Sequence, residues 1–279
     1  MSEPLLITVA PTGAETSKAD CPQLPTTLEE LVATAVECEA AGAAMIHVHV
    51  RDHSHAPTLD LGQLKETVAA LRASTSLVVQ LSTGGSVHDP LSERLKVLDA
   101  EPDSCSLTMG TTNFGDDVFL NPWPFVCDLY QLSQEREVVP EFELFDLGHV
   151  ASLSRLLSRH GLPFGGRVHV DLVMGVPGGM PGTADALVAA VAALPPEVTS
   201  WGATGIGRST LAVGLAALSK GGHLRVGMED VLTLSRGVPV SSNAQLVSRA
   251  AEMGTLAQRS LMTPDEARSF LGIRRAVAN

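Results

Sequence analysis

Residues 44–82 read AMIHVHVRDHSHAPTLDLGQLKETVAALRASTSLVVQLS, and this stretch decides the fold. It contains an apolar run at 44–50, an amphipathic stretch at 61–73 and a second apolar run at 77–82. A strand, a helix and a strand in this order are typical of two parallel strands joined by a helical crossover. The stretch therefore predicts one unit of an α/β fold with a parallel sheet.

The same alternation continues in both directions along the 279 residues. Strands are expected at 5–10, 44–50, 77–82, 104–109, 138–145, 167–174, 199–204 and 224–228. Helices are expected at 27–41, 61–73, 91–100, 124–133, 149–160, 184–194, 209–219 and 243–253, with a short last helix at Pro264–Leu271 capped by Thr263. Eight such units predict a (β/α)8 TIM barrel, a single domain over residues 1–279, because these barrels use ~250 residues as one domain. A doubly wound open sheet is the alternative.

The composition excludes some classes of function. Lysine and arginine total 19 against 31 aspartates and glutamates, which gives a formal net charge of −12. This balance argues against nucleic acid or an anionic membrane as the main partner, because attraction to phosphate needs the opposite sign. The longest apolar run, 187–194, is far shorter than the ~20 residues of a membrane helix, and the first residues resemble no secretory signal. We expect a soluble, cytoplasmic protein without a disulfide framework.

Two histidines end the second expected strand. His47 and His49 are separated by one residue, so their side chains point to the same face, about 7 Å apart along the strand. Functional residues of a TIM barrel gather at this carboxyl end of the strands. Two imidazoles that converge there can bind zinc or a similar ion, with Arg51 and Asp52 as outer supports. The alternative is a pair of hydrogen-bonded histidines in a polar barrel interior.

Glu229 and Asp230 follow the eighth expected strand, which borders the first strand in a closed barrel. Glu229 is the candidate third ligand, because two histidines, one glutamate and an open fourth position make a catalytic zinc site. Asp230, near Arg225, is the candidate general base, and an ordinary salt bridge between the two is the alternative. Adjacent strand residues point to opposite faces, so both acids reach one site only if the strand has ended, which Gly227 permits.

Small polar residues follow the third and fourth strands. Ser82 to Gly85 offer hydroxyl and backbone N–H groups that can hold a carboxylate, and a plain glycine turn is the alternative. Thr108 to Asn113 offer similar groups after the fourth strand. These residues are candidates for substrate binding.

Two charged residues stand at the ends of other strands. Arg208 lies in a glycine-rich turn where barrel enzymes often hold phosphate, although Ser209 as a simple helix cap explains the same turn. Glu15 follows the first strand, where it pairs with a cationic substrate group or is merely solvated.

The remaining histidines are weaker candidates. His169, on the sixth expected strand, is the rival metal ligand, and His53 and His55 lie in a polar loop. Surface or capping positions are expected for His88, His149, His160 and His223.

Six stretches, taken together and in order, are similar to the β-keto acid cleavage enzyme family. They are APTGA at 10–14, HVHVRD at 47–52, STGG at 82–85, PEFELFD at 140–146, GVPGG at 175–179 and GGHLRVGMED at 221–230. Members of that family are zinc-dependent (β/α)8 barrels that convert a β-keto acid and acetyl-CoA into acetoacetate and a new CoA thioester. The resemblance implies zinc as cofactor, acetyl-CoA as co-substrate and a homo-oligomer, a tetramer in the family.

The resemblance also implies roles for the candidate residues. His47, His49 and Glu229 would be the zinc ligands, and Asp230, supported by Arg225, would take the α-proton of the keto acid.

Substrate contacts follow from the same resemblance. Ser82, Gly85 and Thr108 would hold the carboxylate and the keto group of the keto acid. Glu15 matches the position that holds the substrate amino group in the aminohexanoate enzymes of the family, so we expect a keto acid with a cationic tail.

Two other functions compete with this interpretation. Amidohydrolases also use an HxH pair in a barrel, but theirs ends the first strand, with further histidines after the fifth and sixth strands and an aspartate after the eighth. Here the pair ends the second strand, and the fifth offers Glu141 and Glu143 but no histidine. A non-catalytic barrel is the other alternative, and it predicts that chelation or loss of His47 changes nothing.

Overall fold

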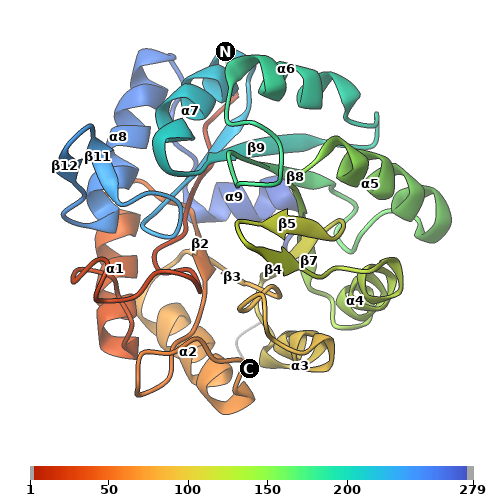
Figure 1. The fold of residues 1–279 in the computed structure, drawn as a ribbon, viewed down its shortest axis with the longest axis horizontal. Helices are drawn as coiled ribbons and strands as arrows, with labels where there is room; N and C mark the ends of the chain where they lie inside the picture. Colours follow the sequence, from red (N-terminus) through yellow and green to blue (C-terminus); the bar gives the residue numbers. More distant parts are fainter. Residues whose placement is uncertain (1–2, 275–279) are drawn as a thin grey trace.

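The computed structural model describes residues 3–274 and contains a closed barrel of parallel strands (Figure 1). Around the barrel the strand order is β1-β10-β9-β8-β7-β4-β3-β2, so neighbouring βα units lie side by side. The (β/α)8 prediction is confirmed, and the doubly wound open sheet is wrong. The barrel strands are β1 (Ile7–Val9), β2 (Met45–Val48), β3 (Val78–Leu81), β4 (Ser104–Thr108), β7 (Val139–Leu144), β8 (His169–Met174), β9 (Ser200–Gly205) and β10 (His223–Val226).

The barrel closes between its first and last strands. Ile7 pairs with Leu224 and Val9 with Val226 in parallel register. On the other side of β1, Thr8 pairs with Met45 of β2. The carboxyl ends of β10, β1 and β2 therefore adjoin one another, although β1 ends at Val9 and β10 begins only at His223.

Helices surround the barrel as the periodicity predicts. They are α1 (Leu28–Ala40), α2 (Leu61–Ser74), α3 (Leu91–Lys96), α4 (Trp123–Glu135), α5 (Leu147–His160), α6 (Ala184–Ala193), α7 (Thr210–Ser219), α8 (Asn243–Leu256) and α9 (Pro264–Leu271). Capping boxes begin α1 at Thr27 and α9 at Thr263, because each threonine pairs with a glutamate three residues later. The expected helix at 91–100 instead ends as the 3-10 turn η1 (Val97–Ala100), and η2 (Gly207–Ser209) precedes α7.

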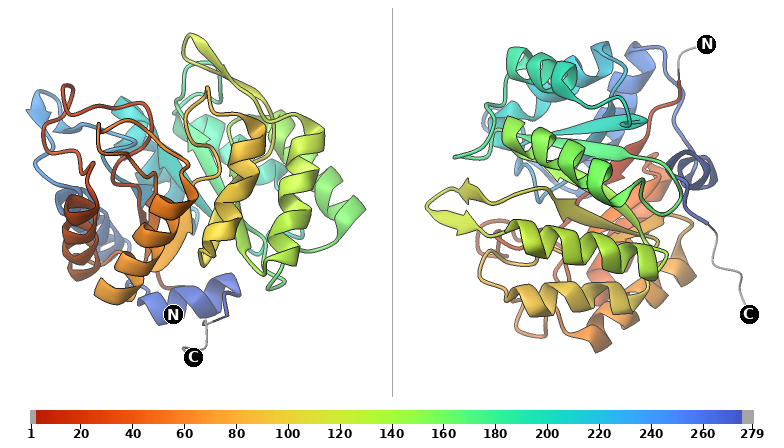
Figure 2. Two further views of the ribbon diagram at one scale, coloured as in Figure 1. Left: turned by 90° about the horizontal axis from the view of Figure 1, so that it is seen from below. Right: turned by 90° about the vertical axis from the view of Figure 1, so that its right-hand side faces the viewer.

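Two short hairpins were not predicted from the sequence. One consists of β5 (Thr112–Phe114) and β6 (Asp117–Phe119), and the other of β11 (Thr233–Ser235) and β12 (Val238–Pro239). Their strands have two or three residues, too few for a visible alternation. Figure 2 shows the β5–β6 hairpin, in yellow-green, projecting beyond the carboxyl ends of the barrel strands.

The opposite end of the barrel is covered by α9 (Figure 2). Ala267, Leu271 and Ile273 pack there against Leu6, Met45 and other residues at the start of the strands. This apolar cover leaves the carboxyl end as the open end of the barrel. Among residues 3–274, no helix combines the length and the hydropathy needed to cross a membrane.

Candidate active site

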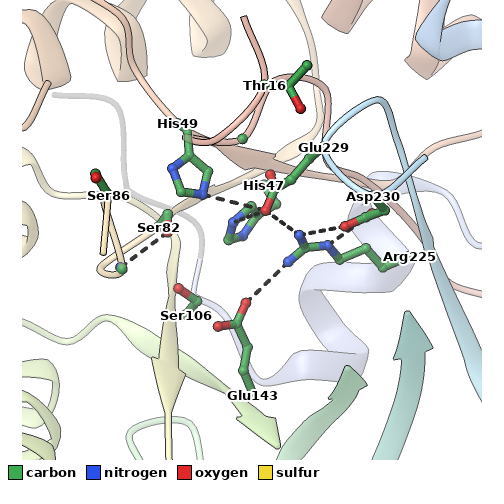
Figure 3. A network of polar contacts seen from close by, with 12 residues as sticks. Thr16, His47, His49, Ser82, Ser86, Ser106, Glu143, Arg225, Glu229 and Asp230 are labelled. Carbon is green, nitrogen blue, oxygen red and sulfur yellow. Dashed lines mark hydrogen bonds and ion pairs between the residues drawn. The ribbon is translucent and has the colours of Figure 1, made fainter. Parts of the chain in front are cut away.

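The carboxyl end of the barrel contains a cavity of about 250 Å³. One side is polar and consists of residues on β2 and β10 and in the segments that follow β1, β2, β3 and β10, and the other side is largely apolar. Of the predicted site residues, the cavity is lined by Glu15, His47, His49, Ser82, Gly85, Arg225, Glu229 and Asp230. Figure 3 shows the polar side, with the Glu229 carboxylate between two imidazoles and a guanidinium.

His47, His49 and Glu229 come together as predicted. Oε1 of Glu229 lies 3.8 Å from Nε2 of His47 and 3.6 Å from Nε2 of His49. One ligand atom from each residue lies within 4.8 Å of the other two, which is the spacing of groups that can hold one metal ion. His47 lies on β2 and His49 directly follows it, whereas Glu229 lies in the turn after β10. Strands β2 and β10 both border β1, so barrel closure creates the cluster.

His47 is fixed by a side chain that was not singled out in the sequence. Its Nδ1 lies 2.6 Å from Oε1 of Gln80, whose amide donates in turn to Oγ of Ser104 at 3.2 Å. With Nδ1 donating to Gln80, Nε2 keeps its lone pair directed toward Glu229. Burial, together with the smaller effect of the neighbouring Arg225, lowers the pKa of His47 to about 3, so the ring is a neutral ligand.

Glu229 has the character of a ligand carboxylate. Burial alone would raise its pKa, but Arg225 and the two imidazoles outweigh burial and hold the pKa well below its ordinary value. Its Oε2 is buried and has no hydrogen-bond partner in the described part of the chain. A buried carboxylate oxygen without a partner is costly, so these three side chains fit a divalent cation that would take up that oxygen.

Arg225 organises the acids next to this cluster. From β10 it donates to both oxygens of Asp230, at 3.4 and 3.0 Å, and also to Oε1 of Glu229. A third acid, Glu143 of β7, lies 3.2 Å from the same guanidinium, 82 residues away in sequence. Thr108 donates to the other oxygen of Glu143 at 2.9 Å. Arg225 is thus held rigidly from three directions.

The pKa values of the acids reflect this crowding. Burial raises the pKa of Asp230 to about 7; Arg225 opposes the change and the adjacent Glu229 adds to it. Burial also raises the pKa of Glu143, again against the effect of Arg225. One guanidinium cannot compensate several buried carboxylates, so a bound cation or a proton is needed for charge balance.

Gly227 explains how Glu229 and Asp230 both face the cavity. Strand β10 ends at Val226, and the N–H groups of Asp230 and Val231 donate to the carbonyl of Gly227 in a tight turn. A Cβ at position 227 would lie 1.8 Å from the carbonyl oxygen of Ala10. The strand therefore ends before Glu229 and turns close to the end of β1. This is the early strand end that we predicted to be necessary if both acids are to point into the cavity.

The substitution Gly227→Ala is therefore expected to destabilise the protein by at least about 3 kcal/mol, because backbone must move to make room. Urea denaturation monitored by circular dichroism measures the change. Gly62→Ala in α2 is the matched control, since a Cβ there meets nothing closer than Asp60 Oδ1 at 3.1 Å, the end of a side chain. Equal stability of the two variants would contradict the proposed close approach of Gly227 to Ala10.

Three predicted contacts do not line the cavity. Thr108 is buried beneath Glu143 and contributes through it, and Asn113 is exposed on β5. Arg208 is exposed in η2, just beyond the cavity wall at Ile206. Of the four stretches proposed for substrate binding, the Ser82–Gly85 turn and Glu15 thus reach the cavity directly.

The predicted outer supports act elsewhere. Arg51 donates to the carbonyls of Gly13 and Thr16 and so fixes the loop that carries Glu15. Asp52 accepts from the backbone of its own loop. The residue that supports His47 is Gln80. In the sequence, Gln80 could have been noticed as the one amide side chain within the apolar run at 77–82.

The prediction of a surface or capping position is wrong for His223, which is buried with its Nδ1 accepting the N–H of Leu6. His149 is also buried, but it does hold a capping position, since its Nδ1 accepts the N–H of Phe145 at the start of α5. The rival ligand His169 is also buried, where Nδ1 contacts Ser200 Oγ at 2.7 Å. It is not part of the metal-ligand cluster found among the described residues.

A closed (β/α)8 barrel with an open, partly charged cavity at the carboxyl end of its strands has the architecture of the TIM-barrel enzymes. Comparison with known proteins narrows this class. The profile of the family described as "beta-keto acid cleavage enzyme" matches residues 4–273. The chain therefore belongs to the beta-keto acid cleavage enzyme family, as its resemblance predicted, and the amidohydrolase alternative is wrong.

Individual relatives agree with this assignment. The chain is 36% identical over 275 residues to a 3-keto-5-aminohexanoate cleavage enzyme of Acetoanaerobium sticklandii, covering 98% of this chain and 100% of the relative. It is 32% identical over 277 residues to a 3-oxoadipate:acetyl-CoA acetyltransferase of Cupriavidus necator, covering 98% and 96% of the two chains. Among solved structures, the apo structure of ObcA matches with a TM-score of 0.76 at 21% identity, over 90% of this chain and 66% of that one, and supports the fold.

Proposed function

We propose that this protein is a zinc-dependent acyltransferase that joins a β-keto acid to acetyl-CoA and cleaves the product into acetoacetate and a new acyl-CoA. The observation that carries the proposal is the cluster of His47, His49 and Glu229 next to the Asp230–Arg225 pair in one cavity. The relatives' names, a keto acid cleavage enzyme and an acetyl-CoA acetyltransferase, support both halves of the reaction.

Zinc, when bound by the three ligands, would supply a Lewis acid that lowers the cost of removing a proton next to the keto group. Asp230 is the base that removes the proton from C2 of the keto acid, since it lies beside the cluster and faces the cavity. Arg225 holds both oxygens of Asp230 and so fixes the direction in which the proton is taken. Glu143 accepts from Arg225 in turn and is itself held by a hydrogen bond from Thr108.

The remaining steps need no nucleophilic side chain. The C2 carbanion attacks the carbonyl of acetyl-CoA, which forms a carbon–carbon bond and releases the CoA thiolate. The thiolate then attacks the original keto carbonyl, and the bond between C2 and C3 breaks. The C2 fragment takes back the proton and leaves as acetoacetate, while the rest leaves as the new CoA thioester. Ser82 and Gly85 line the cavity, and we assign them to hold the carboxylate meanwhile.

The decisive experiment combines purified protein, acetyl-CoA and three keto acids: 3-keto-5-aminohexanoate, 3-oxohexanoate and 3-oxoadipate. Acetoacetate formation and metal content are measured on the same sample. We expect acetoacetate from at least the first acid, with close to one zinc per chain. Metal-loaded protein that yields no acetoacetate from any of them contradicts the proposal.

Charge in the cavity supports a cationic rather than an acidic tail on the keto acid. Among the described residues that line the cavity, Arg225 is the one lysine or arginine, and its donors are taken by three carboxylates. A second carboxylate on the substrate finds no cation there and meets Glu15 at the rim. We therefore expect 3-oxoadipate to be the poorest of the three substrates.

Replacing Glu15 by Gln is expected to raise KM for 3-keto-5-aminohexanoate about three- to fivefold, because an exposed ion pair contributes up to ~1 kcal/mol. KM for 3-oxohexanoate, which lacks the amino group, stays the same. Steady-state kinetics with both acids measure the difference. Glu135→Gln at the end of α4 is the control, exposed but far from the cavity. An unchanged preference between the two acids contradicts the role of Glu15.

A tetramer also remains a proposal. Exposed apolar side chains on neighbouring helices α6 and α7, namely Val188, Leu211 and Leu215, support association of the chain with copies of itself. Sedimentation equilibrium measures the mass in solution.

A further inference from the structure

The side of the cavity that faces the charged cluster is an apolar wall, made of Phe114, Phe119, Phe145, Val173, Val176 and Ile206. Phe145 follows β7, Val173 lies on β8, and Ile206 follows β9. In the barrel order β7 is four strands from β1 in either direction, so the wall stands across the mouth from the loop of Glu15. No charged side chain belongs to the wall.

The wall is one packed unit that spans several loops. The rings of Phe114, Phe119 and Phe145 contact one another edge-on, with centroids 6.2 to 6.4 Å apart. The β5–β6 hairpin is fixed to the loop after β8, because the N–H of Gly115 donates to the carbonyl of Pro177 at 3.0 Å. The projecting hairpin in Figure 2 therefore extends the wall beyond the barrel rim.

The wall begins at the reacting centre and ends at a positive charge. Gly207, next to Ile206, donates its N–H to the carbonyl of Asp230 at 2.8 Å, so this part of the wall adjoins the base. Arg208 follows at once and is exposed. No acidic group lies within ion-pair distance of Arg208 in the part of the chain that the structure describes.

Two organic substrates share this cavity under the proposed function, and they differ in chemistry. The keto acid carries its carboxylate and keto oxygens close together and needs the polar side. The thioester of acetyl-CoA continues into an uncharged arm with amide and dimethyl groups and reaches phosphates only at its far end. An uncharged wall that leads to an exposed arginine matches the thioester and its arm.

We propose that the apolar wall is the thioester subsite: it holds the acetyl group and the pantetheine arm of acetyl-CoA, whose phosphates leave the cavity past Arg208. The keto acid occupies the opposite, polar side, with its tail toward Glu15. This inference rests on the proposed function. It goes further by assigning each of the two substrates to one side of the cavity.

The experiment compares Ile206→Ala, Phe114→Ala and Arg208→Ala, with acetyl-CoA and acetyl-pantetheine as donors. The two wall variants are expected to raise KM for both donors about tenfold, because each loses most of a half-buried apolar side chain whose remaining surface the thioester arm would cover. Arg208→Ala is expected to raise KM for acetyl-CoA severalfold but not for acetyl-pantetheine, which lacks the nucleotide phosphates. KM for the keto acid changes less than twofold in all three. Leu256→Ala at the exposed end of α8 is the matched control.

Calorimetric titration of free CoA provides a readout that does not depend on turnover. Weaker binding of CoA by Ile206→Ala than by the wild-type protein supports the thioester subsite. This holds even if no keto acid yields acetoacetate, a result that would contradict the proposed reaction but not the subsite. A raised KM for the keto acid with an unchanged KM for both donors places the keto acid tail on the wall and overturns the inference. Wild-type protein that does not bind CoA overturns it as well.

Discussion

Asp230→Asn is expected to lower kcat by about 10²- to 10⁴-fold, which is the usual contribution of a positioned general base. Asparagine keeps the size of the side chain and one oxygen for Arg225, but it cannot accept the C2 proton. Asp230 lines the cavity and Arg225 orients both of its oxygens. Glu143 also lines the cavity beside Arg225, but its second oxygen accepts a hydrogen bond from Thr108. Binding of the keto acid should change little, since the ligand cluster and Ser82 remain.

Proton exchange isolates this step from the rest of the reaction. In deuterated buffer without acetyl-CoA, wild-type protein should exchange the C2 protons of the keto acid faster than buffer does, as followed by NMR. Asp230→Asn should reduce this exchange to the buffer rate while the Kd for the keto acid is retained. The control is Asp99→Asn, which removes a carboxylate that is also paired to an arginine, Arg136, in an exposed position. Normal exchange in Asp230→Asn contradicts the role as base.

Loss of one metal ligand is the second large effect. His49→Ala is expected to reduce bound zinc to less than about a tenth of the wild-type content, because two ligands hold the ion far less tightly than three. Activity should fall about 10³-fold, which corresponds to the several kcal/mol that a Lewis acid contributes. Metal analysis of dialysed protein and the acetoacetate assay measure the two effects together.

His49 is the best ligand for this test, because it is partly exposed whereas His47 is fully buried against Gln80. Its removal should therefore leave the fold intact, which thermal unfolding can verify. His53→Ala supplies the control, since this exposed histidine follows the same strand but is not part of the ligand cluster. Equal zinc content in both variants would show that the ion binds elsewhere, and full activity in metal-free protein would rule out a catalytic metal.

The acids around Arg225 connect the general base with the metal ligands, so the effects of Asp230→Asn and His49→Ala each depend on several residues. Glu229 belongs to the ligand cluster and to the Arg225 network at once, so a change in one alters the charge of the other. Glu143 reaches the same guanidinium from β7, on the far side of the barrel from β1. We expect variants of Arg225, Glu229 and Asp230 to be non-additive for this reason.

The barrel and the ligand cluster could both be predicted from local patterns in the sequence. Strand–helix alternation is local and repeats eight times, and a closed barrel then places the ends of the second and last strands near each other. The i, i+2 spacing of His47 and His49 requires a common direction, and Gly227 permits the turn that brings in Glu229. These residues could be predicted because short-range geometry and barrel order suffice to place them.

Only the tertiary structure decided which other side chains meet them. In the sequence, Glu143 is simply one of two acids in an expected strand. Its contact with Arg225 depends on which residues face inward across the whole barrel. Gln80, His149 and His223 are buried polar groups whose partners come from other strands or from backbone, which periodicity does not show. The apolar wall likewise needs the β5–β6 hairpin to fold onto the loop after β8. Such contacts join residues far apart in the chain, so their distances are fixed by packing and closure of the barrel rather than by local pattern.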